Sequence, residues 1–540
     1  MGAQPDDIEA PVLIVGGGLV GLSTAMFLAH HGVRSLVIER LRGASPAPRA
    51  AHFHLRTLEL FRLAGIEEEV RRRSEEEFLP DGAIVAMDCL AGRKLSDIIG
   101  SLNDGVEAVS PCRRLFITQP GLEPILRRQA ERGGAQVIDG RAIVDLAQDQ
   151  SGVIVCARDV TTGMTQELRG RYLVGADGAH SKVRDALGIA LEGRGPFSNS
   201  MTIYFEADLA PYMGGKPLSV IYVNNPALGG VFRLAKDCRS GFLLVNTIGD
   251  PTTNADPADA AKDMSEARLV ELVRIGVGVP DLPVKISAVT RWRATAVVAQ
   301  RYQAGRIFLA GDAVHLMPPN GGFGGNTGVH DAHNLAWKLA WVLKGLAGTE
   351  LLATYETERR PVGAFTAEQA YARYVDRTAP YLSTAGVQPI AADFNVELGY
   401  RYDAPIAAPG DCPVVHEDPR WTFGRPGSRA PHVWLEQNGR RVSSLDLFGR
   451  SFVLLAAARG EAWCHAASPF ADVAPYCVGR DLADRAGQFA AAYGLSATGA
   501  ALIRPDGFVG WRADALADDP RRELARAMRV MLLNDDEAAE

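Results

Sequence analysis

Short apolar runs alternate with a helical pattern at the start of the chain. Residues 11–15 and 35–39 are apolar runs of strand length, and residues 22–31 between them have the composition of a helix. Three glycines, at positions 16 to 18, separate the first run from the helix. Apolar runs that alternate with helices are typical of parallel strands buried on both faces. The pattern therefore predicts a β-α-β unit.

The pattern further along the chain predicts an α/β region with an insertion. Helices are predicted at residues 56–73, 121–132 and 327–344, and strands at residues 153–160, 167–174 and 306–310. Within residues 198–290, β-branched and aromatic residues alternate with polar ones in several short segments. Alternation with a period of two is typical of strands with one buried face. We therefore expect an antiparallel sheet to be inserted into the α/β region.

A third region begins where the composition changes. Residues 403–431 are rich in Pro, Gly and Asp, as in a linker. Strands at 451–456 and 501–511 with a helix at 481–493 then predict a small separate module. The predicted fold class is α/β, with three domains. They are a discontinuous Rossmann-like domain (residues 1–190 and 285–402), a substrate-binding sheet domain (residues 191–284, to whose region residues 80–110 contribute) and a C-terminal domain (residues 403–540).

Composition narrows the class of protein. The 540 residues carry a net charge of −7 with both signs interspersed, so no basic surface for nucleic acid or an anionic membrane is expected. The seven cysteines include no CxxC pair, which favours a reducing compartment and excludes a closely spaced zinc site. Residues 1–9 are polar and acidic, unlike a signal peptide, and no apolar run has the length of a membrane span. We therefore expect a cytoplasmic protein without a metal.

The glycines after the first strand have the spacing GxGxxG. Gly16 allows a tight turn, Gly18 lets the backbone approach a pyrophosphate, and Gly21 lets the helix pack closely on the strand. Leu19 follows in the first helical turn, and Glu39 ends the second strand, where an acid binds a ribose hydroxyl. Because strand, helix and acid all surround the glycines, the motif predicts a dinucleotide site.

Two further motifs follow strands. In residues 172–184 a strand is followed by Asp177-Gly178, and a common turn capped by Ser181 is the structural alternative. In residues 305–319 a strand is followed by Gly311-Asp312, and a glycine-rich stretch then leads to Asn326 and a long helix. By itself each motif is also compatible with an ordinary turn.

The order of the three motifs resembles the single-component flavoprotein monooxygenases of the para-hydroxybenzoate hydroxylase type. The resemblance covers essentially the whole chain. Three segments resemble bacterial aromatic polyketide hydroxylases in particular, namely residues 110–127, 321–328 and 504–512. The tail from about residue 431 resembles the thioredoxin-like domain of this subgroup. It has no CxxC, so we expect it to be structural and without dithiol chemistry.

The resemblance implies FAD as cofactor and NAD(P)H as a transient co-substrate. It places the pyrophosphate at Gly16, Gly18 and Gly21, where the amides and dipole of a helix N-terminus favour an anion. At the adenosine end it implies Glu39 at the AMP ribose and Arg40 beside the adenine. It implies Gly311 and Asp312 at the ribityl and phosphate part, and Asp177 and Gly178 at the nucleotide and NAD(P)H. At the flavin it implies Gln119 on the flavin side, Arg49 near the flavin or nicotinamide, and the helix at Asn326 with its N-terminus at the pyrimidine edge.

A departure from the family lies at Ala51. Phenol hydroxylases of the family carry an acid or a histidine there that deprotonates the phenol, and here His52 stands beside the gap. An imidazole that titrates within about one unit of pH 6.5 would accept that proton. The alternatives are that His52 is a packed or solvated loop histidine, or that a phenol acidified by neighbouring carbonyls requires no protein base.

The resemblance implies hydroxylation of a polycyclic aromatic polyketide with NAD(P)H and O2 through a flavin C4a-hydroperoxide. Two alternatives stay open at this point. One is a flavoenzyme of the same fold that performs Baeyer-Villiger insertion, epoxidation or oxidative rearrangement. The other is a non-catalytic FAD-bound carrier of a labile intermediate. A homodimer is compatible with either.

Overall fold

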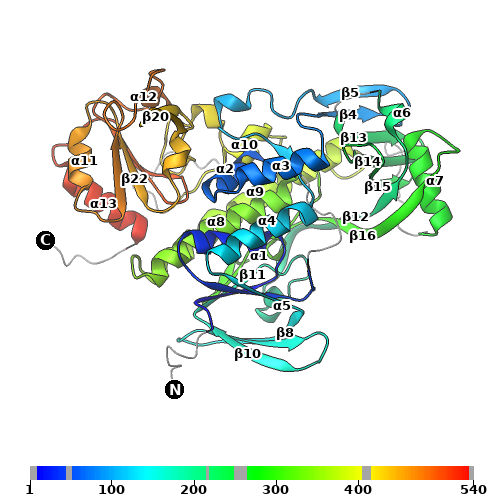
Figure 1. Ribbon diagram of the computed structural model, residues 1–540, viewed down its shortest axis with the longest axis horizontal. Coiled ribbons are helices and arrows are strands. Elements are labelled where there is room, and N and C mark those ends of the chain that lie inside the picture. Colours follow the sequence, from blue (N-terminus) through cyan, green and yellow to red (C-terminus); the bar gives the residue numbers. More distant parts are fainter. Residues whose placement is uncertain (1–8, 44–51, 215–217, 249–263, 404–414, 534–540) are drawn as a thin grey trace.

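The computed structural model describes residues 9–43, 52–214, 218–248, 264–403 and 415–533. It has a central α/β region, a large sheet on one side of it and a small C-terminal domain on the other (Figure 1). This is the predicted fold class, an α/β Rossmann-like domain with a sheet domain and a thioredoxin-like domain. No helix of the described part is long and apolar enough to cross a membrane.

A six-stranded sheet forms the centre, in the order β17-β18-β11-β1-β2-β7. Neighbouring strands are parallel except at the β17–β18 edge. The strands are β1 (Val12–Val15), β2 (Ser35–Glu39), β7 (Gln136–Asp139), β11 (Tyr172–Gly175), β17 (Gln303–Ala304) and β18 (Ile307–Leu309). A three-stranded sheet of β8 (Arg141–Gln148), β9 (Val153–Asp159) and β10 (Thr165–Gly170) lies beside it. Because β1, β2 and β11 are almost entirely buried, the sheet forms the main core.

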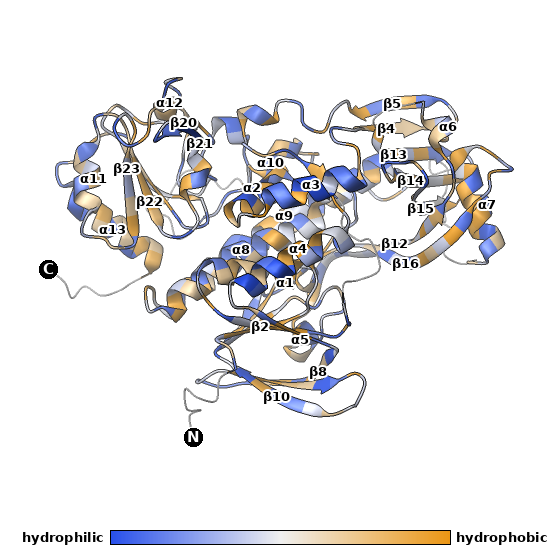
Figure 2. Ribbon diagram, viewed as in Figure 1, coloured by the Kyte–Doolittle hydropathy of each residue, from blue (hydrophilic) through white to orange (hydrophobic). Residues whose placement is uncertain are grey.

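Helix α8 (Phe323–Leu343) is the most deeply buried helix of this region. Every residue from 326 to 341 is buried, including charged and amide side chains. It packs against α1 (Leu19–His30), and Gly328 allows that contact, because a Cβ atom there would lie 2.6 Å from the Val20 side chain. The other helices around it are α2 (Leu55–Leu63), α3 (Glu67–Glu77), α4 (Gln119–Arg132), α5 (Lys182–Ala186), α9 (Thr354–Arg377) and α10 (Asp393–Glu397). In Figure 2 α3 is hydrophilic, because only Val70 and Ser74 of it are buried.

The second large sheet has eight strands in the order β19-β16-β12-β15-β14-β13-β4-β5. They are β4 (Ala83–Met87), β5 (Lys94–Ile99), β12 (Leu191–Glu206), β13 (Leu218–Asn225), β14 (Leu228–Leu234), β15 (Ser240–Ile248), β16 (Lys285–Ala299) and β19 (His315–Leu316). The sheet is antiparallel except where β4 runs parallel to β13. Helix α7 (Glu266–Val277) packs on one face with a core of its own, and α6 (Ala210–Met213) lies nearby.

The C-terminal domain contains a four-stranded sheet in the order β23-β22-β24-β25. Its elements are β20 (Trp434–Gln437), β21 (Arg440–Ser443), β22 (Phe452–Ala456), α11 (Glu461–Ala467), β23 (Val473–Cys477), α12 (Phe489–Ala492), β24 (Ala500–Ile503), β25 (Val509–Ala513) and α13 (Pro520–Leu532). Strands β22 and β23 are parallel, and the other pairs are antiparallel. Trp337 and Trp341 of α8 pack edge-on against Phe452, so this core continues into the central region.

Several predicted elements differ from the structure. The helix expected over residues 56–73 is two helices, α2 and α3, because the chain turns at Gly65 with a left-handed φ of 76°. The strand expected over residues 167–174 is divided between β10 and β11, which belong to different sheets. Of the helix expected over residues 481–493, only α12 is helical. Helix α8 also begins at Phe323, before the predicted residue 327.

A buried network of charges joins the C-terminal domain to α8 and α9. Glu358 of α9 accepts hydrogen bonds from Arg504 (2.7 and 2.9 Å) and from Lys338 of α8 (2.8 Å). Arg504 also pairs with Asp506, at 2.5 Å. These four side chains are at most 2% exposed, and Arg504 and Lys338 together hold the pKa of Glu358 at about 2. The ionised carboxylate is therefore part of the folded junction.

Removing Arg504 tests this junction. We expect Arg504→Leu to lower the free energy of unfolding by about 3–5 kcal/mol, because Asp506 and Glu358 lose a buried partner. Urea unfolding followed by tryptophan fluorescence measures the change. Arg127→Leu, which removes a partly exposed pair with Asp139, is the matched control and changes the free energy by no more than about 1 kcal/mol. Equal effects of the two substitutions would contradict the importance of the buried network.

Candidate functional site

The glycine-rich loop between β1 and α1 leaves one position open for a ligand. Gly16 has a φ of 104°, and a Cβ atom on it would lie 2.3 Å from the carbonyl oxygen of Ala176. A Cβ atom on Gly21 would lie 1.8 Å from the Gly16 carbonyl oxygen. Around Gly18, in contrast, the nearest atom would be 3.6 Å away. Gly16 and Gly21 are thus required by packing, whereas packing within the chain does not require a glycine at position 18.

Glu39 is held beside this loop. Its carboxylate accepts hydrogen bonds from the backbone amides of Gly17 (2.5 Å) and Leu41 (2.6 Å). These bonds fix the end of β2 against the glycine turn. Arg40 is exposed next to it, and Leu19 is buried in the first turn of α1.

Gln119 lies across the loop from Gly18. It is the first residue of α4, which Thr118 caps by accepting a hydrogen bond from the Gly121 amide. The Gln119 amide donates to Glu123 at 2.5 Å, while its Oε1 atom is buried without a partner among the described residues. Buried polar atoms are normally hydrogen-bonded, so an orphaned acceptor here points to a donor outside the chain.

The aspartates of the two later motifs, Asp177 and Asp312, have different surroundings. Asp177 accepts hydrogen bonds from the Ser181 hydroxyl and from the amides of Lys182 and Val183. Ser181 caps α5 by accepting a hydrogen bond from the Arg184 amide, as the structural alternative predicts. Gly178 follows with a φ of 84°. Asp312 instead has an exposed side chain in the turn after β18.

Asp331 of α8 fixes the backbone beside Asp312. Its carboxylate accepts from the Gly311 amide (3.1 Å) and from the Arg359 Nε atom (2.8 Å), and it pairs with His315 Nε2 (2.8 Å). All three side chains of this cluster are fully buried, and the Arg359 guanidinium, followed by His315, lowers the pKa of the Asp331 carboxyl. The turn after β18 is therefore anchored to the buried helix.

Asn326 anchors another loop to the first turn of α8. Its Oδ1 atom accepts from the His54 amide (2.9 Å) and from the Thr57 hydroxyl (2.7 Å). Its Nδ2 atom donates to the carbonyls of His52 (2.8 Å) and Gly322 (2.7 Å). The side chain thus uses its polar atoms within the chain and positions residues 52–57 beside the start of the helix.

His52 lies between Gly322 and Phe116. Its ring stacks on Phe116 with centroids 4.5 Å apart, and a Cβ atom on Gly322 would lie 3.1 Å from the His52 Cβ. The His52 Nε2 atom is buried without a partner among the described residues. Burial, followed by the nearby His54 and Arg114, lowers the pKa of His52 well below 6.5. The expectation that His52 titrates near pH 6.5 is therefore wrong, because a buried imidazole loses the hydration that stabilises its charge.

Several residues of this region are missing from the sequence-based set. His54, Thr57, Asp331 and Arg359 are brought together only by the packing of α2, α8 and α9. The one signal in the sequence for these residues was the number of polar and charged side chains within residues 326–338. Such side chains are rarely so frequent on an apolar helix. Arg49 lies outside the described residues.

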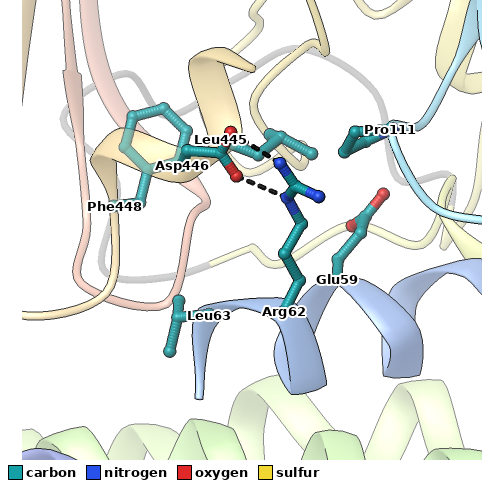
Figure 3. A pocket seen from close by; sticks show the side chains of 7 residues that line it. All are labelled: Glu59, Arg62, Leu63, Pro111, Leu445, Asp446 and Phe448. Carbon is teal, nitrogen blue, oxygen red and sulfur yellow. Dashed lines mark hydrogen bonds and ion pairs between the residues drawn. The ribbon is translucent and has the colours of Figure 1, made fainter. Parts of the chain in front are cut away.

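A cavity of about 370 Å³ lies elsewhere, between α2 and the C-terminal domain. Figure 3 shows Arg62 directed at Asp446, with which it forms hydrogen bonds of 2.6 and 3.0 Å. Glu59 at its edge is already paired with Arg56 and Arg429. Because its charged groups are satisfied within the chain and none belongs to the glycine loop, we assign this cavity to the domain junction.

The residues present fit FAD. Gly18 follows the turn that Glu39 holds, and the exposed Asp312 lies in the turn that Asp331 holds. Gln119, with its orphaned Oε1, begins α4 next to Thr118, which bonds to Glu77. Gly18 and Leu19 start α1, where free amides attract phosphate.

Family models match both parts of the chain. Residues 9–370 match the FAD binding domain, and residues 424–533 match the C-terminal domain of aromatic-ring hydroxylases. These matches agree with the central region and the C-terminal domain of the structure.

Individual relatives cover nearly the whole chain. A 4-methyl-5-nitrocatechol 5-monooxygenase from Burkholderia sp is 50% identical over 98% of both chains. Tetracenomycin A2 monooxygenase-dioxygenase from Streptomyces glaucescens is 39% identical over 97% of both chains. A crystal structure of aklavinone-11 hydroxylase in ternary complex with FAD and aklavinone superposes with a TM-score of 0.92 at 36% identity, and covers 97% of this chain and 99% of that chain.

These likenesses confirm the predicted FAD cofactor and the resemblance to polyketide hydroxylases. The chain belongs to the family of FAD-binding aromatic-ring hydroxylases and is an FAD-dependent aromatic monooxygenase.

Proposed function

We propose that the protein hydroxylates a phenolic ring, with NAD(P)H as reductant and O2 as oxygen donor, and that His52 accepts the phenolic proton. The observation that carries the role of His52 is its buried, unpartnered Nε2 atom beside the start of α8. Burial keeps the imidazole neutral with a free acceptor nitrogen, as a general base requires, and the same lowered pKa makes it a weaker proton acceptor than a histidine in water.

FAD, when bound, supplies the reduction by NAD(P)H and the activation of O2. The chain would hold and orient it. Gly18 and the start of α1 would bind the pyrophosphate, Glu39 and Arg40 the adenosine end, and Asp312 the ribityl chain. The Oε1 atom of Gln119 would accept a hydrogen bond on the flavin side. We keep Asp177 and Gly178 as supporting residues, and Asp177 acts there by shaping its turn.

The start of α8 contributes electrostatics. The first amides of a helix have no partner within it, and the macrodipole favours negative charge at that end. Asn326 holds the preceding turn in place through Gly322 and His52. This arrangement would stabilise negative charge that develops on a group bound there, and would place His52 on the same side.

Two classes of substrate are represented among the relatives. Aklavinone and tetracenomycin, in the names of several relatives, are polycyclic polyketides, and this class agrees with the predicted function. A single-ring nitrocatechol is a second candidate, favoured by the 50% identity to 4-methyl-5-nitrocatechol 5-monooxygenase over nearly the full length. We further propose a cytoplasmic location, which is supported by the six described cysteines, all of them free thiols. We also propose that the protein forms a homodimer.

The function is tested by product analysis. The FAD-loaded protein is incubated with NADH or NADPH, O2 and a panel of polycyclic phenols and nitrocatechols. We expect one oxygen atom in the organic product for each NAD(P)H consumed, and substrate-stimulated oxidation of NAD(P)H. A carrier without activity would bind the aromatic and leave NAD(P)H oxidation unchanged. A lactone, an epoxide or a rearranged product would contradict hydroxylation.

The role of Gly18 is tested by filling its free space. We expect Gly18→Val to lower FAD affinity at least tenfold, about 1.4 kcal/mol, while the unfolding midpoint of the FAD-free protein stays unchanged. The φ of −83° at Gly18 is accessible to valine, so the backbone is not strained. FAD fluorescence titration measures the affinity. Gly100→Val, at an exposed position without neighbours, is the control. Wild-type FAD affinity of Gly18→Val would place the pyrophosphate elsewhere.

The role of His52 is tested with His52→Phe, which preserves an aromatic ring on Phe116. We expect the hydroxylation step to slow about 10²–10⁴-fold with unchanged FAD affinity, because the acceptor nitrogen is lost. Since the pKa of His52 lies well below 6.5, the imidazole is already neutral at pH 6.5. The wild-type profile from pH 6.5 to 8 should therefore follow the phenol of the substrate. Stopped-flow kinetics at several pH values measures both.

His416→Phe is the matched control, because the ring of His416 stacks on Phe365 with the same 4.5 Å separation of ring centroids. It should retain the wild-type rate. If His52→Phe hydroxylates as fast as the wild type, His52 is not the base. If the pH profile of the wild type has an inflection near pH 6.5 that is absent in His52→Phe, His52 is not neutral and buried as described.

A further inference from the structure

Arg233 is a buried cation without an anionic partner among the described residues. It lies on β14 in the eight-stranded sheet and is 5% exposed. Its Nε and Nη1 atoms have no hydrogen-bond partner in the part of the chain that the structure describes. Burial lowers the pKa of Arg233 well below its ordinary value, and only Glu77 opposes that effect. An unpaired buried charge costs several kcal/mol, so its presence calls for an explanation.

Glu77, the carboxylate that raises the pKa of Arg233, is hydrogen-bonded to other groups. It accepts hydrogen bonds from the amide (2.7 Å) and the hydroxyl (3.0 Å) of Thr118, and it pairs with Arg73 at 3.0 Å. Its bonds therefore hold the N-terminus of α4 and do not reach the guanidinium. A hollow of about 20 Å³ beside Arg233 has room for about one water, which would not neutralise the charge.

Two phenylalanine rings enclose the guanidinium. Its central carbon lies 3.5 Å from the ring centroid of Phe116 and 4.0 Å from that of Phe78. Cation–π contacts of this kind stabilise a desolvated cation. They leave the Nε and Nη1 atoms without acceptors among the described residues.

The same Phe116 ring also stacks on His52. Since the guanidinium and the imidazole are both within stacking distance of one ring, they occupy its opposite faces. His52 and Arg233 are therefore separated by the thickness of one aromatic ring, and both have orphaned nitrogen atoms. The stack begins at Gly322, at the start of α8. A flat ligand along the edge of this stack would meet a proton acceptor at one end and a cation at the other.

We propose that Arg233 selects aromatic substrates that carry a second, negatively charged oxygen, such as a phenolate, nitro or carboxylate oxygen, and that it holds this oxygen while His52 faces the phenol to be hydroxylated. The proposal rests on the proposed function. It explains why a charge is retained between two phenylalanine rings. The planar guanidinium of arginine has paired N–H donors that match the two oxygens of a nitro or carboxylate group better than the ammonium of lysine does.

The test compares two probes that differ in one group, 4-methyl-5-nitrocatechol and 4-methylcatechol, on the FAD-loaded protein. Binding is measured by flavin fluorescence. The ionisation of the bound nitrocatechol is read from its visible difference spectrum, because the anion and the neutral form absorb differently. Arg233→Met removes the charge and keeps an apolar stem between the rings. Arg233→Lys keeps the charge without the fork. Arg239→Gln removes an exposed charge from the neighbouring turn and is the control.

We expect Arg233→Met to weaken nitrocatechol binding at least tenfold and 4-methylcatechol binding less than threefold, and to reduce the anionic fraction of the bound nitrocatechol. Arg233→Lys should restore part of that anionic fraction, and Arg239→Gln should behave as the wild type. The unfolding midpoint of Arg233→Met should be equal or higher, since a desolvated charge is removed.

Three outcomes overturn the proposal. The first is an equal loss of affinity for both probes together with a lower unfolding midpoint, which would give Arg233 a purely structural role. The second is an unchanged affinity of Arg233→Met for the nitrocatechol. The third is a wild-type protein that binds the two probes equally well. The proposed function is judged separately, because it fails only if no phenol of the panel yields a hydroxylated product.

Discussion

A long helix with polar side chains, buried on all sides, is the constraint on which this structure depends. Helix α8 carries Asp331, Asn334 and Lys338 through the core, and each must find a partner there because water is excluded. Arg359 and Glu358 of α9 supply two of these partners. The helix is therefore tied to its neighbours by specific charged contacts, and its position along its own axis is fixed.

This fixed helix organises the candidate site at two places. Asp331 holds the turn after β18 through the Gly311 amide. Asn326 holds residues 52–57 through three hydrogen bonds and the turn before its own helix through a fourth, to Gly322. The turn after β18 and residues 52–57, which are far apart in the chain, are thus oriented by one element. The same helix continues into the C-terminal domain through Trp337, which gives that domain a structural part in a site it does not itself contain.

The electrostatics of the site follow from the exclusion of water. His52 is neutral because its ring is buried, and Arg233 lacks a counter-ion on the other side of Phe116. The His52 Nε2 atom and two nitrogen atoms of Arg233 have no partner among the described residues. Buried polar atoms without partners are costly, so each calls for an explanation, and the ligand that we propose supplies one. The likeness to a hydroxylase solved with FAD and aklavinone agrees with such a binding region.

The sequence by itself determined the local parts of this protein. The GxGxxG turn, the first two strands of the central sheet and the acid that ends β2 could be predicted because they depend on residues within about thirty positions of each other. It could not predict that the helix expected from residue 56 breaks at Gly65, or that β4 pairs with β13 in parallel. The ionisation of His52 and the unpaired state of Arg233 were likewise decided only by tertiary structure. Both depend on which side chains exclude water around them, and those side chains come from segments far apart in the chain.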